Sequence, residues 1–234
     1  MEEERSKVSK RTEERKSTPT RKRKSDNSES QSHQERKSGS KKPKEQRVNL
    51  VLLGMSGTGK SASGNTILRN KHFESRASSK QVTTECQLVE AEIYGRPVRV
   101  IDTPDIFDDD IKPSDKDKHV ERCNELCQSD PRVFLLVMQV GRFTDGERNV
   151  LEKLDKAFGV RAREQTIILF TCGEELQRDG MTLEEFLRSC QPGLKMIIEK
   201  CGYRCLTFEN RASGSDQSEK LMQTVSRLLE TQRK

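Results

Sequence analysis

Eight consecutive residues, Gly54 to Ser61, satisfy the pattern GxxxxGK[ST], which is typical of loops that bind phosphate. Glycines let the backbone turn its N–H groups toward an anion, and the positive end of a following helix strengthens the attraction. The Lys60 ammonium is expected to reach the β- and γ-phosphates of a nucleotide, and the Ser61 hydroxyl is expected to bind Mg²⁺. The predicted nucleotide contacts in this stretch are Gly54, Met55, Ser56, Gly57, Thr58, Gly59, Lys60, Ser61 and Ala62.

An acidic residue ends a second apolar segment in the sequence Val100-Ile101-Asp102-Thr103-Pro104-Asp105. In phosphate-loop proteins, an aspartate at the end of a neighbouring strand holds the magnesium ion. An aspartate at a strand end is also a common turn residue. Asp102 follows the phosphate loop by a single predicted hairpin, and this order favours the magnesium role.

The elements that must position these residues are apolar segments alternating with segments of helical period. Strand-like segments occupy residues 48–53, 86–93, 98–101, 133–140, 166–171 and 204–208. Helical segments occupy residues 115–128, 145–158, 182–200 with a break near Pro192, and 216–231, and a helix-compatible stretch follows Ser61. Residues 94–97 predict a hairpin turn. We therefore predict an α/β fold with a mostly parallel six-stranded sheet, helices on both faces and one antiparallel edge strand.

The positive charge of the chain is concentrated at its N-terminus. The 234 residues carry a formal net charge of +6, and residues 1–47 hold 16 Lys and Arg against 9 Asp and Glu. In that stretch Met1 and Val8 are the only apolar side chains, which is too few for a core. We predict a disordered basic tail over residues 1–46 and a folded domain over residues 47–234. The folded domain has almost no net charge, and this argues against a domain that coats nucleic acid.

Two basic clusters in the tail, residues 21–24 and 41–44, have the composition of nuclear-import signals or of patches that contact anionic surfaces, and equally of solvated linkers. No apolar run reaches the roughly 18 residues that a membrane-spanning helix needs. The first residues lack the apolar centre of a secretory signal. We expect a cytoplasmic protein without a transmembrane segment, with nuclear import through the tail as an alternative.

Residues 48 to about 231 resemble the immunity-associated GTPases, the GIMAP or IAN family with its AIG-type G domain. The resemblance is carried by GMSGTGKSASGNTIL, VTTEC, GRPVRVIDTPDIFD, FLLVMQVGRFTDGERNV, IILFTCGEEL and IEKCGYRCLTFEN, in that order. It implies a Ras-like P-loop domain with three layers, α/β/α. It also implies GTP or GDP as ligand with Mg²⁺, slow hydrolysis, and self-association through the switch regions in the GTP state.

The resemblance implies further residues on the phosphate side of the site. The first-switch threonine that binds Mg²⁺ and the γ-phosphate is Thr83 or Thr84, between which the segment VTTEC does not decide. Ser75 lies where the family's loop comes near the nucleotide.

The resemblance also places residues around the base. Glu174, preceded by Cys172 and Gly173, aligns with the acid that reads guanine, and Glu175 is the alternative in a frame shifted by one residue. Acids in these positions are also common in the first turn of a helix. Asn210 resembles the residue that supports the base, and an asparagine is equally common in a turn.

Three positions depart from the family pattern. Asp105 stands where the family has a glycine whose N–H contacts the γ-phosphate, and its carboxylate would repel that phosphate. Ile106 replaces a glutamine that orients water in Ras-type enzymes, so little hydrolysis is expected. Gly173 replaces a lysine that packs along the base. These residues leave two hypotheses: a guanine-nucleotide switch or scaffold with slow or negligible hydrolysis, or a pseudo-GTPase interaction module with weakened nucleotide binding and no switching.

Overall fold

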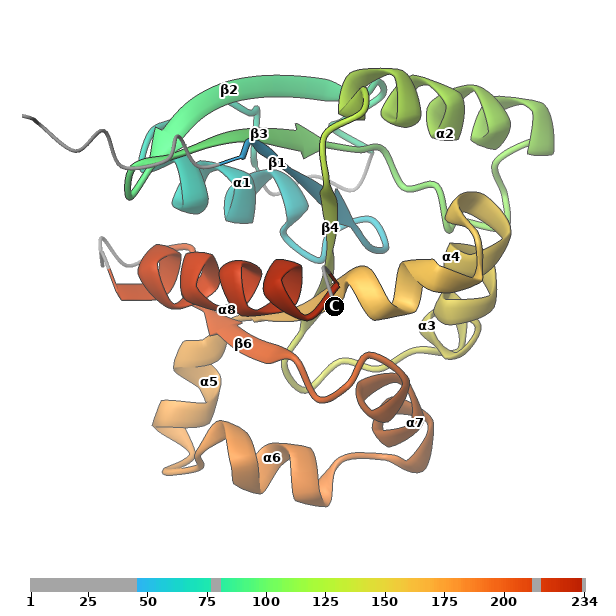
Figure 1. Ribbon diagram of the computed structural model, residues 1–234. Coiled ribbons are helices and arrows are strands. Elements are labelled where there is room, and N and C mark those ends of the chain that lie inside the picture. Colours follow the sequence, from blue (N-terminus) through green and yellow to red (C-terminus); the bar gives the residue numbers. More distant parts are fainter. Residues whose placement is uncertain (1–45, 77–80, 212–215, 233–234) are drawn as a thin grey trace, which may run out of the picture. The chain divides into compact units, whose positions relative to one another are not determined.

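A six-stranded sheet lies at the centre of the fold (Figure 1). The computed structural model describes residues 46–76, 81–211 and 216–232, so the predicted tail and its basic clusters lie outside the described residues apart from Gln46. The strands are β1 (Val48–Leu53), β2 (Gln87–Ile93), β3 (Arg96–Asp102), β4 (Arg132–Gln139), β5 (Thr166–Thr171) and β6 (Cys205–Phe208), in the order β2-β3-β1-β4-β5-β6. Among these described strands only the β2–β3 pair is antiparallel, which confirms the predicted sheet.

Helices cover both faces of this sheet, as predicted. Apolar residues of α1 (Lys60–Leu68) and α8 (Asp216–Gln232) pack on one face, where Leu50 and Leu52 of β1 point. Residues of α2 (Pro113–Cys127), α4 (Val150–Phe158) and α7 (Pro192–Lys200) pack on the other, with Val51 and Leu53. The remaining helices are α3 (Asp145–Arg148), α5 (Gly173–Arg178), α6 (Leu183–Ser189) and the 3₁₀ helix η1 (Val160–Gln165).

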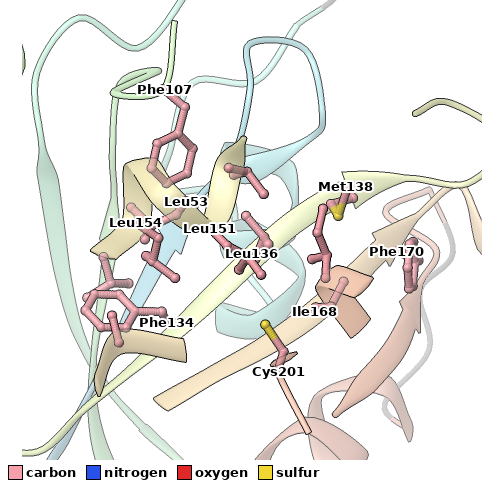
Figure 2. Close-up of a cluster of buried hydrophobic side chains, with 14 of the residues drawn as sticks. Leu53, Phe107, Phe134, Leu136, Met138, Leu151, Leu154, Ile168, Phe170 and Cys201 are labelled. Atoms are coloured by element: carbon pink, nitrogen blue, oxygen red, sulfur yellow. The ribbon is translucent and has the colours of Figure 1, made fainter. Parts of the chain in front are cut away.

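The central strand β1 is buried along its whole length because it has a parallel neighbour on each side and a helical layer on each face. Leu50 pairs with Val100 of β3 and with Val133 of β4. Figure 2 shows one of the two cores, in which side chains of β1, β4 and β5 meet those of α4 and the chain beyond β3. This packing fixes the carboxyl ends of β1 and β3, where the predicted site lies.

Several element boundaries differ from those predicted. The prediction of one helix over residues 145–158 is wrong: α3 and α4 meet at Asn149, and a capping box of Thr144 and Glu147 begins α3. The hairpin turn consists of Tyr94 and Gly95 alone, because their positive φ angles of 51° and 80° allow Arg96 to pair with Ile93. Helix α5 is not predicted by the sequence pattern, since six residues are too few to show a helical period.

In the part of the chain that the structure describes, every helix is too short or too polar to cross a membrane.

Candidate functional site

The phosphate loop connects β1 to α1 (Figure 1), and several of its glycines have positive φ angles. Gly54 has a φ of +146°, and a Cβ placed there would lie 2.3 Å from the Val137 carbonyl oxygen of β4. Gly59 caps α1 with a φ of +96°. Because a side chain would clash at Gly54 and is strained at both φ values, the loop can pass this close to β4 only with glycine.

Lys60 lies inside this loop and is only 8% exposed. Its Nζ donates to the carbonyl oxygens of Gly54, at 2.9 Å, and Met55, at 3.0 Å. Burial lowers the pKa of Lys60, and the nearby Asp105 and Asp102 carboxylates oppose that shift. An ammonium has three donors, so the two carbonyl bonds orient the group and leave one donor for a ligand.

A cavity of about 470 Å³ opens beside the loop. Predicted site residues supply most of its lining: Ser56, Gly57, Gly59, Lys60, Ser61, Ala62, Ser75, Thr83, Asp105 and Asn210. The other predicted residues do not line it, namely Gly54, Met55, Thr58, Thr84, Asp102, Cys172, Gly173 and Glu174. Predicted residues that are far apart in the sequence are thus brought to one cavity.

Three oxygen-bearing side chains meet at the start of α1. The Ser61 hydroxyl donates to Asp102 Oδ2 at 2.6 Å, and the Thr83 hydroxyl lies 3.1 Å from Ser61 Oγ and 3.2 Å from the same carboxylate oxygen. Asp102 Oδ1 is buried without a hydrogen-bond partner, and burial raises the pKa of Asp102. Of the two threonines that the sequence left open, Thr83 makes these contacts, and Thr84 is exposed.

These oxygens fit a magnesium ion. Mg²⁺ prefers oxygen ligands and is bound through one or two protein groups together with water and substrate phosphates. The described residues contain no cluster of three or more His, Cys, Asp or Glu side chains that could hold a metal alone. The hydroxyls of Ser61 and Thr83 and the carboxylate of Asp102, beside the phosphate loop, match that requirement, and Asp102 Oδ1 is still without a hydrogen-bond partner.

Asn210 lines the cavity from the turn after β6. Its Oδ1 accepts from Thr66 Oγ1 at 2.8 Å, and its Nδ2 donates to Ser63 Oγ at 3.2 Å, so the side chain is fixed on α1. A Cβ on Gly59 would lie 3.3 Å from Asn210 Nδ2. The amide therefore packs directly on the phosphate loop, next to where α1 begins.

The predicted base-reading segment follows β5. Thr171 Oγ1 donates to the Thr58 carbonyl at 2.8 Å and to the Met138 carbonyl at 3.2 Å, which ties this segment to the phosphate loop. Cys172 adopts a left-handed conformation with a φ of 59° and is the N-cap residue of α5.

Glu174 and Glu175 occupy the first turn of α5 and differ in their surroundings. Glu174 Oε2 is buried without a hydrogen-bond partner, whereas Glu175 Oε2 lies 3.8 Å from the position of a Cβ on Gly141. A Cβ on Gly173 would lie 3.0 Å from Thr207 Cβ, so the position filled by lysine in the family pattern is crowded here by β6. An unpartnered buried carboxylate oxygen can accept from N–H donors, and this is the feature that distinguishes Glu174 from Glu175.

Asp105 and Ile106 show why two departures from the family pattern matter. The Asp105 carboxylate accepts from the N–H of Ser56 in the phosphate loop and, at 3.1 Å, from the N–H of Phe107. Its backbone has a negative φ, so the aspartate causes no left-handed strain. Ile106 is 6% exposed, belongs to the core and is not among the residues that line the cavity.

The cavity also contains residues that the sequence did not single out. Arg211 and Arg76 add positive charge to its lining, and Thr103 anchors the chain after β3 by donating from Oγ1 to the Leu52 carbonyl at 2.7 Å. In the sequence, the only indication that Arg211 lines the cavity is its position directly after Asn210. A lone arginine in a turn is too common to identify a binding residue.

The family model of the AIG1 family matches residues 48–234. The chain belongs to the AIG1 family. It is 36% identical over 189 residues to immune-associated nucleotide-binding protein 8 of Arabidopsis thaliana, covering 80% of this chain and 54% of that protein. It is 39% identical over 171 residues to GTPase IMAP family member 8 of Rattus norvegicus, covering 73% of this chain and 24% of that protein. This AIG1-family chain therefore spans about half or less of the curated relatives it matches.

Solved structures share the fold of this AIG1-family chain at low sequence identity. Toc33 from Arabidopsis thaliana in complex with Mg²⁺ and GMPPNP superposes with a TM-score of 0.58 at 19% identity, covering 81% of this chain and 87% of that chain. A dimerization-deficient mutant of Toc33 from Arabidopsis thaliana superposes with a TM-score of 0.58 at 17% identity, covering 81% of this chain and 86% of that chain. The Ras-like P-loop fold predicted for this AIG1-family chain is confirmed.

Proposed function

We propose that residues 47–234 form a G domain that binds GTP or GDP with Mg²⁺ in the cavity beside the Gly54–Ser61 loop. The observation that carries the proposal is that the buried Lys60 side chain and the hydroxyl residues Ser61 and Thr83 line one cavity, with both hydroxyls hydrogen-bonded to Asp102 behind them. The loop N–H groups and Lys60 would hold the phosphates, and bound Mg²⁺ would neutralise phosphate charge. Toc33 structures with GDP or GMPPNP and Mg²⁺ support this choice of ligands.

Guanine is the base that the surroundings of α5 suit best. The unpartnered Glu174 oxygen can accept from the N–H groups on one edge of guanine, which adenine lacks. Asn210, fixed on α1 by Thr66 and Ser63, would support the base from the other side.

The same site offers little for hydrolysis. Ile106 is buried in the core and carries no polar atom, so it cannot orient an attacking water. We propose a switch or scaffold with slow or negligible hydrolysis, which in the GTP state associates with another copy through its switch regions. Dimerization is important for the GTPase activity of the chloroplast translocon components atToc33 and psToc159, and this motivates the search for self-association here.

A second candidate is a pseudo-GTPase interaction module with weakened nucleotide binding. Two observations favour it: the Ser56–Asp105 hydrogen bond closes part of the phosphate loop, and Gly173 removes a lysine expected beside the base. The two candidates make different predictions for residues 81–118. A switch should adopt different conformations there with GTP and with GDP, whereas the interaction module should adopt the same conformation with both.

Calorimetric titration of the full chain with GDP, GTP and ATP, with and without Mg²⁺, tests the proposal. Guanine nucleotides should bind with Mg²⁺, ATP should bind at least about tenfold more weakly, and Lys60→Ala should lose most of the affinity. Lys71→Ala, an exposed lysine after α1, is the matched control and should bind like the wild type. Absence of binding below millimolar nucleotide in the wild type would contradict the proposal.

A further inference from the structure

The carboxylate of Asp105 is an anion already bound to the phosphate loop. It accepts a hydrogen bond from the backbone N–H of Ser56, and it is close enough to Lys60 to stabilise that ammonium. Asp105 is 2% exposed, so this anion is shielded from solvent. The N–H groups and the ammonium of such a loop are the groups that otherwise bind phosphate oxygens.

The segment that carries Asp105 is held in place on both sides. Thr103 is fixed to β1 through the Leu52 carbonyl, and Ile106 and Phe107 are buried in the core. Figure 2 shows the Phe107 ring beside the cluster of buried side chains that includes Leu53. From α4, Lys153 Nζ donates to the Phe107 carbonyl at 2.8 Å. These contacts hold the backbone on both sides of Asp105 and so keep its carboxylate next to the phosphate loop.

The position of Asp105 along the cavity identifies which phosphate it would replace. Asn210, the proposed base support, packs on Gly59, where α1 begins. Ser56 lies three residues earlier in the loop, next to the Met55 carbonyl that binds Lys60. The lysine of this motif binds the β- and γ-phosphates. The phosphate nearest the base would therefore lie at the start of α1, and the phosphate furthest from the base would lie near Ser56. The Ser56 end is thus the subsite for the outermost phosphate.

We propose that the Asp105 carboxylate occupies the terminal-phosphate subsite, so that the resting site accepts a nucleoside diphosphate and admits a triphosphate only when Asp105 is displaced. The inference rests on the proposed nucleotide function and deepens it by assigning the preferred ligand. A nucleoside diphosphate can bind the N–H groups nearest α1 and one N–H of the Lys60 ammonium without contacting the Asp105 carboxylate. A γ-phosphate would compete with Asp105 for Ser56 N–H and would be repelled by its charge.

Competitive titration with fluorescent GDP and a non-hydrolysable GTP analogue, in the full chain with Mg²⁺, measures this preference. We expect the wild type to bind GDP about tenfold or more tightly than the GTP analogue. Asp105→Asn and Asp105→Gly should each raise affinity for the GTP analogue about tenfold or more and change that for GDP by less than about threefold. Asp110→Asn, which removes an exposed charge from the same loop, is the matched control and should leave the ratio unchanged.

The outcomes separate this inference from the proposed function. Equal affinities of the wild type for both nucleotides, or Asp105 variants that change both affinities alike, would overturn the role of Asp105 and leave nucleotide binding intact. Failure of all variants to bind either nucleotide would overturn the proposed function, and the inference with it. Asp105→Asn keeps the size of the side chain, so a folding defect in Asp105→Gly alone would not prevent the decision.

Discussion

Ser61 at the start of α1 donates a hydrogen bond of 2.6 Å to Asp102 at the end of β3. The bond joins two elements that are adjacent to the phosphate loop, and the second oxygen of Asp102 is buried without a partner. A carboxylate in this state is costly to bury unless a cation or donor binds it. The pair therefore fits the magnesium site proposed above.

Asp102→Asn should remove the dependence of nucleotide binding on magnesium. In the wild type, chelation of Mg²⁺ should weaken GDP binding about tenfold or more, because the ion joins phosphate to protein. In the variant, the affinity should be low and the same with or without Mg²⁺. The measurement is GDP titration in magnesium and in EDTA, with the exposed Asp110→Asn as control. A full magnesium effect in Asp102→Asn would contradict this assignment.

Thr83→Ala and Thr84→Ala distinguish the two switch threonines. Thr83 lies 3.1 Å from Ser61 Oγ, whereas Thr84 is exposed. Loss of the Thr83 hydroxyl should weaken magnesium-dependent nucleotide binding by about fivefold to tenfold, the typical effect of one polar contact. Thr84→Ala should have less than about a twofold effect. Reversed effects in the same titration would assign the switch role to Thr84.

Glu174→Gln should weaken guanine-nucleotide binding more than Glu175→Gln. A carboxylate that accepts N–H bonds in a buried site contributes about tenfold to hundredfold in affinity, and glutamine retains only one acceptor oxygen. Glu175 has the same charge and lies one residue further along α5, so Glu175→Gln is the matched control. Comparable losses in both variants, measured by GDP calorimetry, would show that neither acid alone reads the base.

Leu136→Ala should destabilise the fold by about 2–5 kcal/mol, because it leaves a cavity in a close-packed core. Leu136 is almost completely buried in β4 and belongs to the cluster drawn in Figure 2. Val160→Ala is the control, since Val160 is 77% exposed and should change the free energy of unfolding by less than about 0.5 kcal/mol. Denaturant unfolding measures both values, and a loss below about 1 kcal/mol for Leu136→Ala would indicate that the β4 core is loosely packed.

Stability should decline between about pH 9 and pH 11 because of buried thiols. Burial raises the pKa of Cys201 to about 11 and that of Cys205 to about 12, from an ordinary value of 9.0. In this range the unfolded chain releases thiol protons that the native chain retains, so the unfolded state binds fewer protons and the free energy of unfolding falls as pH rises. Thermal unfolding at pH 8, 9 and 10 should show a shallower decline for the Cys201→Ala/Cys205→Ala variant. An identical slope in variant and wild type would exclude these thiols as the cause.

The sequence was sufficient to predict the sheet and the phosphate loop because both depend on local patterns. β1 is a short apolar run followed by a glycine-rich motif, and β5 has the same bounds as its prediction, Thr166–Thr171. Helix α5 was missed because it spans less than two turns. The choice between Thr83 and Thr84 depends on which hydroxyl reaches Asp102, and neighbouring identical residues carry no such information.

The effect of Asp105 could be predicted only in part. Repulsion of a γ-phosphate follows from its charge, but the hydrogen bond to Ser56 depends on how the chain after β3 packs. The same holds for Glu174, whose distinction from Glu175 depends on burial of a single oxygen atom. Long-range packing, which sequence spacing does not encode, decides each of these contacts.

Thr171 has a consequence for how the phosphate half of the proposed nucleotide site, at the Gly54–Ser61 loop, communicates with its base half, at the start of α5. Its hydroxyl bonds the backbone of the phosphate loop at Thr58 and that of β4 at Met138, while its own backbone leads directly into the segment before α5. A fragment that fills only one half, such as pyrophosphate or a free nucleobase, is therefore expected to stiffen the unfilled half as well. Valine at this position would keep the shape of the side chain and uncouple the two.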